Sequence, residues 1–389
     1  MRSYFGYEKP MHFIFPVDGT CVNEYDGEVV DGKLFIKVKL NAPAGREIFV
    51  NEKKAEYNSC GNYYECEIGF KAYRTTLFAE DKTHPENNMK IVVYKLSDCT
   101  GKYRLSVDDN IIFLIELAKN KDVYNSIFDH QFLAIYKKAH DLYGTKTHIN
   151  IYYEYTSECM KHFSEHKEYF NITMMPDKFK PEFIANSDWL KFSFHARSND
   201  PDKPYIDTTY ERMDADIKLI HDEMKRFMGE EVFTPVTTLH WGESTIAGVR
   251  ALRENGYKAI DAYFDFDEKT GEPLVSLYYP PEVIKSFCDR DFWVDTEEDV
   301  ICAKVDAVLN TLKLEQVVPE LERIKLNPHK AGFLELLIHE QYFYSDYRAY
   351  IPEYAEIILT ACEWAAKNGY KPALFSEVIF EPTNPYNIY

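Results

Sequence analysis

Two neighbouring carboxylates, Asp108 and Asp109, follow the segment Arg104–Val107 and precede Asn110, a residue that tolerates a left-handed turn. The pattern predicts a short strand that ends in an acidic pair. Like charges this close disfavour joint ionisation unless a cation lies beside them. One carboxylate would then bind a metal ion, and the other would act as a base. For the pair alone, a turn that caps the next segment is the favoured interpretation.

Three histidines also stand at the ends of segments with strand character: His195 after 190–194, His240 after 233–239 and His339 after 333–338. In a parallel α/β barrel, the carboxyl ends of all strands share one rim, so residues far apart in sequence would converge there. One carboxylate and two imidazoles, with water completing the shell, suit a catalytic zinc site or that of a similar divalent ion. Each histidine alone has a simpler interpretation as a core or loop residue.

Helical patterns separate these strands and predict the elements that would position the histidines. Ser126 and Asp129 form a capping box that predicts a helix start, and Gly144 predicts its end. Further helices are expected over 208–228, 297–312, 316–326 and 351–368, with an inserted hairpin over 265–295. Repeated strand–helix units of this size predict a parallel sheet, open or closed into a barrel.

The first hundred residues have a different pattern, with predicted strands and turns but no predicted helix. Residues 33–40 alternate, with Leu34, Ile36, Val38 and Leu40 on one face, and turn residues separate further short strands. We therefore expect residues 1–100 to form a small Ig-like β-sandwich domain, and residues 101–389 to form the α/β domain.

Composition excludes several classes of protein. The 389 residues are 45% hydrophobic, enough for a large core, and the net charge of −19 disfavours nucleic-acid and membrane partners. Eight scattered cysteines without a CxxC pair suit a reducing compartment, and no apolar run or signal peptide is evident, so a cytoplasmic location is expected. The expected partner is a small-molecule or carbohydrate substrate, and a homo-oligomer stays open.

The motifs resemble those of the polysaccharide deacetylase family, the family-four carbohydrate esterases. The family's T-F-D-D-G corresponds to 106–110 here, its L-x-I-H to 336–339, and the first histidine of its H-[ST]-x-x-H to His195. The resemblance implies a distorted (β/α)7 barrel over 101–389. It also implies Asp108 as general base, Asp109 and His195 as metal ligands, and His339 as general acid.

Two family features are missing. The second metal histidine is absent, and 238–242 replaces the arginine-bearing R-x-P-x-G motif. We expect His240, which lies in the replacement, to supply the missing ligand. The predicted cofactor is one divalent metal ion, with zinc the expected identity.

The predicted function is a metal-dependent hydrolase that removes an acetyl or similar acyl group from a carbohydrate or related small metabolite. Two alternatives remain. A non-catalytic carbohydrate-binding protein could use a degenerate barrel of this type. The string H-x-x-E-H at His162 and His166 matches a zinc metallopeptidase motif if it lies on a helix, although its surroundings are charged as on a solvated surface.

Overall fold

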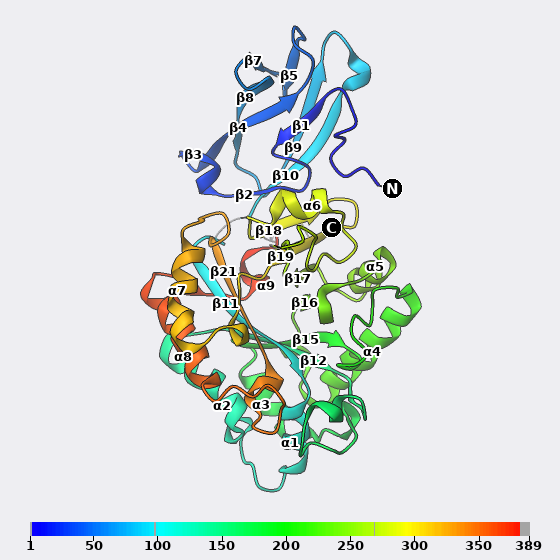
Figure 1. Ribbon diagram of the computed structural model, residues 1–389, viewed down its shortest axis with the longest axis vertical. Coiled ribbons are helices and arrows are strands. Elements are labelled where there is room, and N and C mark those ends of the chain that lie inside the picture. The colour runs from blue at the N-terminus through cyan, green and yellow to red at the C-terminus, as the bar shows by residue number, and fades with distance from the viewer. Residues whose placement is uncertain (1, 97–98, 268, 382–389) are drawn as a thin grey trace.

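The computed structural model describes residues 2–96, 99–267 and 269–381. Strands β1 to β10 gather at one end of the molecule, and a larger α/β region carries the remaining elements (Figure 1). Chain segments on both sides of the expected boundary at residue 100 contact one another. Tyr4 and Phe5 pack into the core of the α/β region, and the Trp293 indole N–H donates to the Asp18 carbonyl at 2.8 Å.

The N-terminal region contains two five-stranded sheets. One consists of β1 (His12–Phe15), β3 (Gly27–Val30), β4 (Lys33–Asn41), β7 (Glu56–Asn58) and β8 (Tyr63–Phe70). The other consists of β2 (Cys21–Val22), β5 (Ile48–Val50), β6 (Lys53–Lys54), β9 (Arg74–Asp81) and β10 (Met89–Lys95). The predicted alternation in β4 is confirmed, because Leu34, Ile36, Val38 and Leu40 are buried in a core that both sheets share.

The largest sheet of the α/β region carries the acidic pair. Its parallel strands run in the order β15 (Leu190–Ala196), β12 (Thr147–Tyr152), β11 (Lys102–Asn110), β21 (Phe333–His339) and β20 (Ala307–Val308), with β22 (Lys371–Pro372) beside β11. A second sheet contains β16 (Val236–Thr238), β17 (Ala259–Ala262), β19 (Val300–Lys304) and β18 (Phe292–Asp295). A small hairpin joins β13 (Glu154–Tyr155) and β14 (Phe170–Asn171).

The distorted (β/α)7 barrel that the resemblance implies is not confirmed, because the described residues form no closed ring of strands. A single parallel bridge, Phe192 to Phe233, connects β15 with the segment before β16. In the second sheet, β19 pairs with β17 along one edge and with the antiparallel strand β18 along the other. In a closed barrel, β20 of the largest sheet would pair with β19 along the edge that β18 occupies here. The strands of the α/β region therefore form two main sheets and one two-stranded hairpin rather than a single ring.

Helices flank these sheets (Figure 1). They are α1 (Ile112–Lys119), α2 (Gln131–Tyr143), α3 (Lys180–Ala185), α4 (Tyr210–Phe227), α5 (Ile246–Glu254), α6 (Pro281–Phe287), α7 (Leu314–Lys325), α8 (Tyr354–Lys367) and α9 (Phe375–Val378). Gly144 ends α2 with φ 70°, as its position predicted. The Ser126–Asp129 capping box forms, but it caps a 3₁₀ turn that precedes α2.

Two expected elements differ from the structure. Residues 297–312, expected to be a helix, form β19, β20 and a 3₁₀ turn at Leu309–Thr311. All five residues of β19 are buried, and a short, continuously apolar run does not separate a strand from a buried helix by its period. The insertion at 265–295 contains α6 as well as β18, so it is not a simple hairpin.

In the described part of the chain, no helix combines the length and apolarity that crossing a bilayer requires. No disulfide bond joins the eight cysteines.

Candidate metal centre

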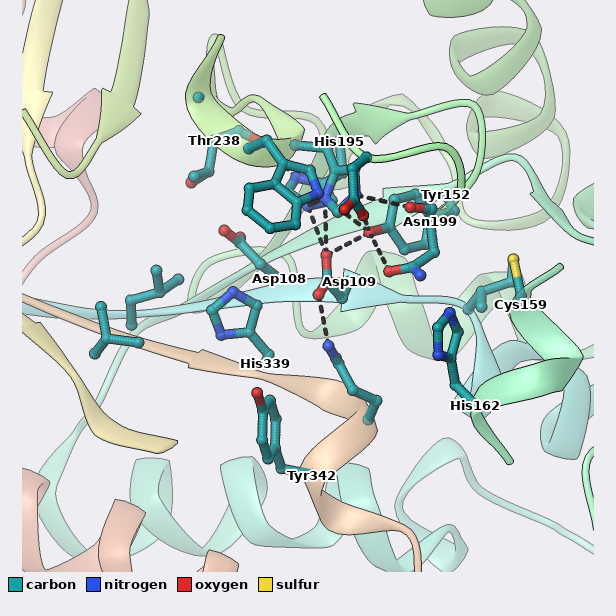
Figure 2. A pocket seen from close by; sticks show the side chains of 18 of the residues that line it. Asp108, Asp109, Tyr152, Cys159, His162, His195, Asn199, Thr238, His339 and Tyr342 are labelled. Atoms are coloured by element: carbon teal, nitrogen blue, oxygen red, sulfur yellow. Dashed lines mark hydrogen bonds and ion pairs between the residues drawn. The ribbon is translucent and has the colours of Figure 1, made fainter. Parts of the chain in front are cut away.

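The structure brings Asp109, His195 and His240 together at the carboxyl ends of their strands. Figure 2 shows Asp109 and His195 side by side. The Asp109 Oδ1 atom lies 3.0 Å from His195 Nε2 and 3.1 Å from His240 Nδ1. The two imidazole nitrogens lie 3.2 Å apart. These three residues come from β11, from β15 and from the 3₁₀ turn after β16, so the strand ends converge although no closed barrel is found.

Two backbone carbonyls fix the tautomers of both rings. His195 Nδ1–H donates to the Thr238 carbonyl at 2.5 Å, and His240 Nε2–H donates to the Asn199 carbonyl at 3.0 Å. A carbonyl oxygen only accepts, so the hydrogen of each neutral ring must lie on that side. The remaining nitrogens, His195 Nε2 and His240 Nδ1, therefore direct their lone pairs at Asp109. Outer hydrogen bonds of this kind are typical of metal-binding histidines.

The cluster contains more acceptors than hydrogens. The Tyr152 hydroxyl lies against Asp109 Oδ1, 2.9 Å from His240 Nδ1 and 3.2 Å from the Asn199 side-chain oxygen, yet it has one hydrogen to share. Lone pairs that face one another without a hydrogen between them repel each other, and a cation bound between them would remove this repulsion. Ligands ~2.0–2.1 Å from a tetrahedral zinc ion stand roughly 3.3 Å apart, close to the observed separations. The residues present therefore fit a divalent metal ion.

A left-handed backbone at Asp109 explains how two adjacent acids reach one cavity. Side chains alternate along a regular strand, so Asp108 and Asp109 would face opposite sides. The pairing of β11 with β12 is irregular between Val107 and Asn110, and Asp109 has φ 64°. The left-handed residue is thus Asp109 rather than the expected Asn110. Such strain is uncommon outside glycine and often marks functional positions.

Both carboxylate oxygens of Asp109 are held. Oδ1 faces the two histidines, and Oδ2 accepts a hydrogen bond from the Gln341 side chain at 2.7 Å. Burial acts to raise the pKa of Asp109. When no metal ion is bound, His240 and His195 can each carry a second proton, and the charge of His240 and hydrogen bonds from both protonated rings overcome the effect of burial and hold the pKa of Asp109 well below its usual range. Asp109 is therefore ionised, as a metal ligand must be.

Asp108 is buried beside this centre. Burial first, and then the charge of Asp109, raises the pKa of Asp108 well above its usual range. The Asn150 side-chain amide donates to Asp108 Oδ1 at 2.7 Å, which opposes the rise. A dication held by Asp109 would neutralise the second cause of the raised pKa and favour the basic form of Asp108.

Behind Asp108, a chain of buried hydrogen bonds runs to a guanidinium group. Arg104, 1% exposed, contacts His148 Nδ1 at 2.7 Å, and His148 Nε2 contacts the Ser193 hydroxyl at 2.7 Å. Ser193 donates to Asn150, which donates to Asp108. Because arginine only donates, every hydrogen in this chain points towards the Asp108 carboxylate. This series of hydrogen bonds fixes the position of the Asp108 carboxylate on the side that faces Arg104.

His339 lies beside Asp108, its register partner in the β11–β21 ladder. Its Nδ1–H donates to the Asn310 side-chain oxygen at 2.8 Å, so its Nε2 is the nitrogen available for proton transfer. Burial lowers the pKa of His339, the charge of Asp109 opposes this, and the charge of His240 adds to it. All five residues predicted for the site therefore line one cavity of about 430 Å³.

Trp241 extends over the same cavity. It directly follows His240, has φ 63°, and leaves 47% of its surface exposed. A bulky aromatic residue is rarely left-handed and half exposed at once, so the loop holds the indole at the pocket against a conformational cost. Aromatic faces in such positions stack on ring-shaped ligands.

Residues 159–166 do not form the α-helix that the metallopeptidase alternative requires at the H-x-x-E-H string. Residues Cys159–His162 form a 3₁₀ turn that ends before His166. His162 Nε2 faces Asp200 at 3.3 Å, whereas His166 Nδ1 pairs with Asp346 at 2.9 Å. The two histidines serve different carboxylates, and within the described ranges only Asp109, His195 and His240 form a group able to hold a metal ion. The metallopeptidase alternative is therefore wrong.

Several site residues escaped the sequence analysis: Tyr152, Asn150, Gln341 and Asn310. Tyr152 lies in a strand rich in buried residues, where a tyrosine looks like any core aromatic. Asn310 lies in the segment mistaken for a helix. The one available signal was Gln341, two residues beyond His339 at the same strand end.

Neither a protein-family model nor a curated protein matches the sequence. Similar solved structures include a 4-alpha-glucanotransferase from Thermococcus litoralis (12% identity, TM-score 0.43), for which 71% of this chain is covered but only 39% of the other. A CE4 esterase from Streptococcus mutans has 12% identity and a TM-score of 0.36, covering 71% of this chain and 86% of its own. A CE4 family pseudoenzyme from Bacillus anthracis has 11% identity and a TM-score of 0.33, covering 84% and 89%. CE4 proteins, the family that the motifs resemble, are thus among the structural neighbours.

Proposed function

We propose that this protein is a metal-dependent hydrolase that removes an acyl group from an amide or ester of a carbohydrate or related small metabolite. The observation that carries the proposal is the cluster of three acceptor atoms on Asp109, His195 and His240, within 3.2 Å of one another. Asp108 and His339, two groups able to move protons, line the same cavity. This combination suits hydrolysis better than binding alone.

Asp109, His195 and His240 would hold the ion. A divalent ion bound there supplies a Lewis acid that polarises a scissile carbonyl group and lowers the pKa of water. Gln341 and the carbonyls of Thr238 and Asn199 keep the ligand atoms aimed at one point. Zinc is the ion that this donor set suits best.

Asp108 would accept the proton from the attacking water. The oxygen of that water bonds to the acyl carbon, the C–N or C–O bond breaks, and a His339 ring that is also protonated at Nε2 delivers this proton to the departing amine or alcohol. The products are a carboxylate and the deacylated compound. Asn150 and Asn310 hold these two proton carriers by hydrogen bonds of 2.7 and 2.8 Å, so neither has to reorient during the reaction.

Two substitutions separate metal binding from catalysis. Asp109→Asn removes the charged ligand and is expected to abolish zinc binding, measured by elemental analysis of the purified protein. Asp108→Asn is expected to retain zinc but to lower the hydrolysis rate by about 10²–10⁴-fold, the usual contribution of a general base. Asp188→Asn, which makes the same change at an exposed position outside the cavity lining, is the control.

Zinc retained at full occupancy by Asp109→Asn would contradict the metal centre. A fully active Asp108→Asn variant would contradict the role of the base. A zinc-loaded protein that binds carbohydrates but hydrolyses no acylated sugar would favour the non-catalytic alternative.

A further inference from the structure

The cavity has two chemically different ends. At one end, one glycine and five aliphatic side chains line the wall. They come from the 3₁₀ turn after β16, from the end of β17 and the loop that follows it, from the residue after β19, and from β20 and β21: Gly242, Ala262, Val275, Val305, Val308 and Leu337. We call these six residues the aliphatic arc. The lining around His162, towards the other end, includes the polar residues Asn199, Asp202 and Arg348 as well as Cys159 and Phe163.

The aliphatic arc is a continuous surface. Val308 is the register partner of Leu337 in the β20–β21 ladder, and the Val305 amide donates to the Ala262 carbonyl at 2.9 Å. A Cβ atom on Gly242 would stand 2.1 Å from Val275 Cγ1 and 3.4 Å from the Ala262 Cβ. Gly242 therefore leaves room for Val275 to close the arc against Ala262, a contact that alanine would prevent.

The arc lies on the side of the proton carriers. Leu337 precedes His339 by two residues on β21, so the two side chains share one face of the strand. Figure 2 shows Asp108 and His339 on one side of Asp109, and His162 and Asn199 on the other. A carbonyl group at the centre would therefore direct one substituent towards the aliphatic arc and the other towards the polar end.

We infer that the acyl group removed by this protein is an aliphatic chain longer than acetyl, of about four carbons or more, seated against the aliphatic arc. The inference rests on the proposed hydrolase function and names the substrate class of the same site. An acetyl group presents a single methyl to this wall, whereas a longer chain could also cover Val275 and Val308, the two arc side chains that are partly exposed. Each further buried methylene favours binding about fourfold. Hydroxyl-bearing parts of the substrate match the polar end.

The test uses nitrophenyl esters of acetate, propionate, butyrate and hexanoate with the zinc-loaded full-length protein, so that only the acyl chain varies. Hydrolysis adds water across the ester bond and releases the acid and nitrophenol. The expected result is a kcat/KM about tenfold higher for butyrate than for acetate. Val308→Phe fills the arc and should abolish this preference by lowering kcat/KM for butyrate more than for acetate, and Val308→Ala should move the optimum to longer chains.

Val123→Phe is the matched control, because Val123 is 71% exposed and lies outside the pocket lining; it should behave as the unmodified protein. A second measurement does not depend on turnover. Butyrate should bind the zinc-loaded protein about tenfold more tightly than acetate in calorimetric titration, and Val308→Phe should remove the difference.

Acetate ester hydrolysed at least as fast as butyrate ester, with equal binding of the two acids, would overturn the inference and leave the hydrolase proposal standing. If no ester and no acylated sugar is hydrolysed, the hydrolase proposal fails. An unchanged tenfold binding preference would then still support the aliphatic arc as an acyl-chain site, and equal binding would overturn it.

Discussion

The His339 imidazole is held by an amide rather than by a carboxylate. The Asn310 side-chain oxygen accepts from the His339 backbone N–H at 3.2 Å and from its Nδ1–H at 2.8 Å. This contact orients the ring towards the cavity but adds no negative charge to stabilise an imidazolium. Burial, which lowers the pKa of His339, is therefore opposed mainly by Asp109.

Replacing Asn310 with aspartate should raise the pKa of His339, because a carboxylate stabilises the charged ring. If His339 donates a proton in the reaction, the alkaline limb of the pH–rate profile should move to higher pH. Asn310→Ala removes the orienting contact and should lower kcat about tenfold without loss of zinc. Profiles with identical limbs in the unmodified protein and in Asn310→Asp would contradict the assigned role of His339.

Tyr152→Phe deletes the hydroxyl that lies against Asp109 and His240. Outer contacts to metal ligands typically contribute 10–100-fold to affinity, so zinc affinity should fall by about that factor. Competition with a chromogenic chelator measures it. Tyr155→Phe, whose hydroxyl donates instead to the His166 carbonyl at 3.0 Å, is the control. Equal zinc affinities for both variants would show that the Tyr152 hydroxyl does not support the centre.

Ser193→Ala interrupts the hydrogen-bonded chain between His148 and Asn150. Because Asn150 then loses one of the contacts that fix it against Asp108, kcat should fall about tenfold while KM and zinc content stay unchanged. Ser106→Ala is a matched control, since the buried Ser106 hydroxyl has no hydrogen-bond partner within the described part of the chain. A rate loss of the same size in both variants would mean that general destabilisation, not the chain, is responsible.

Because of His221, the free energy of unfolding should decrease as the pH becomes acidic. Burial lowers the pKa of His221 from 6.5 to about 4. Between pH 4 and pH 6.5, His221 is therefore protonated in the unfolded chain but neutral in the folded protein. The stabilising contribution is fully present above pH 6.5 and is lost as the pH falls towards 4, by roughly 2–3 kcal/mol.

His221→Gln removes that titration. Urea unfolding at pH 7 and pH 4.5 should show a smaller loss of unfolding free energy in the variant than in the unmodified protein. The opposite ranking, or parallel losses, would show that His221 titrates normally in the folded state.

The positions of the site residues at strand ends were predictable, because the end of a strand can be recognised from the residues immediately around it. The apolar runs before Asp108, His195 and His339 marked buried strands, and parallel pairing brought their ends to one place. The convergence of His240 was predicted as well, since its strand ends within two residues of it. None of these inferences required the barrel to close.

The unpredicted features depend on contacts between distant segments. Edge pairing by β18 separates the two sheets, and nothing in residues 292–304 alone distinguishes an antiparallel neighbour from a parallel one. The partners of the site residues likewise became visible only when strands were placed side by side. Asn310 lies in a short 3₁₀ turn, and the apolar residues around this turn have a spacing that also fits a helix.

The irregular ladder at Asp109 bears on how distant relatives could be recognised. Two consecutive acids in an evenly paired strand would serve opposite faces of a sheet, so the dipeptide by itself is a poor signature. A more selective search would require the dipeptide to fall within an offset in register, with an asparagine or glycine as the next residue. Divergent chains that have lost other hallmarks would still satisfy that criterion.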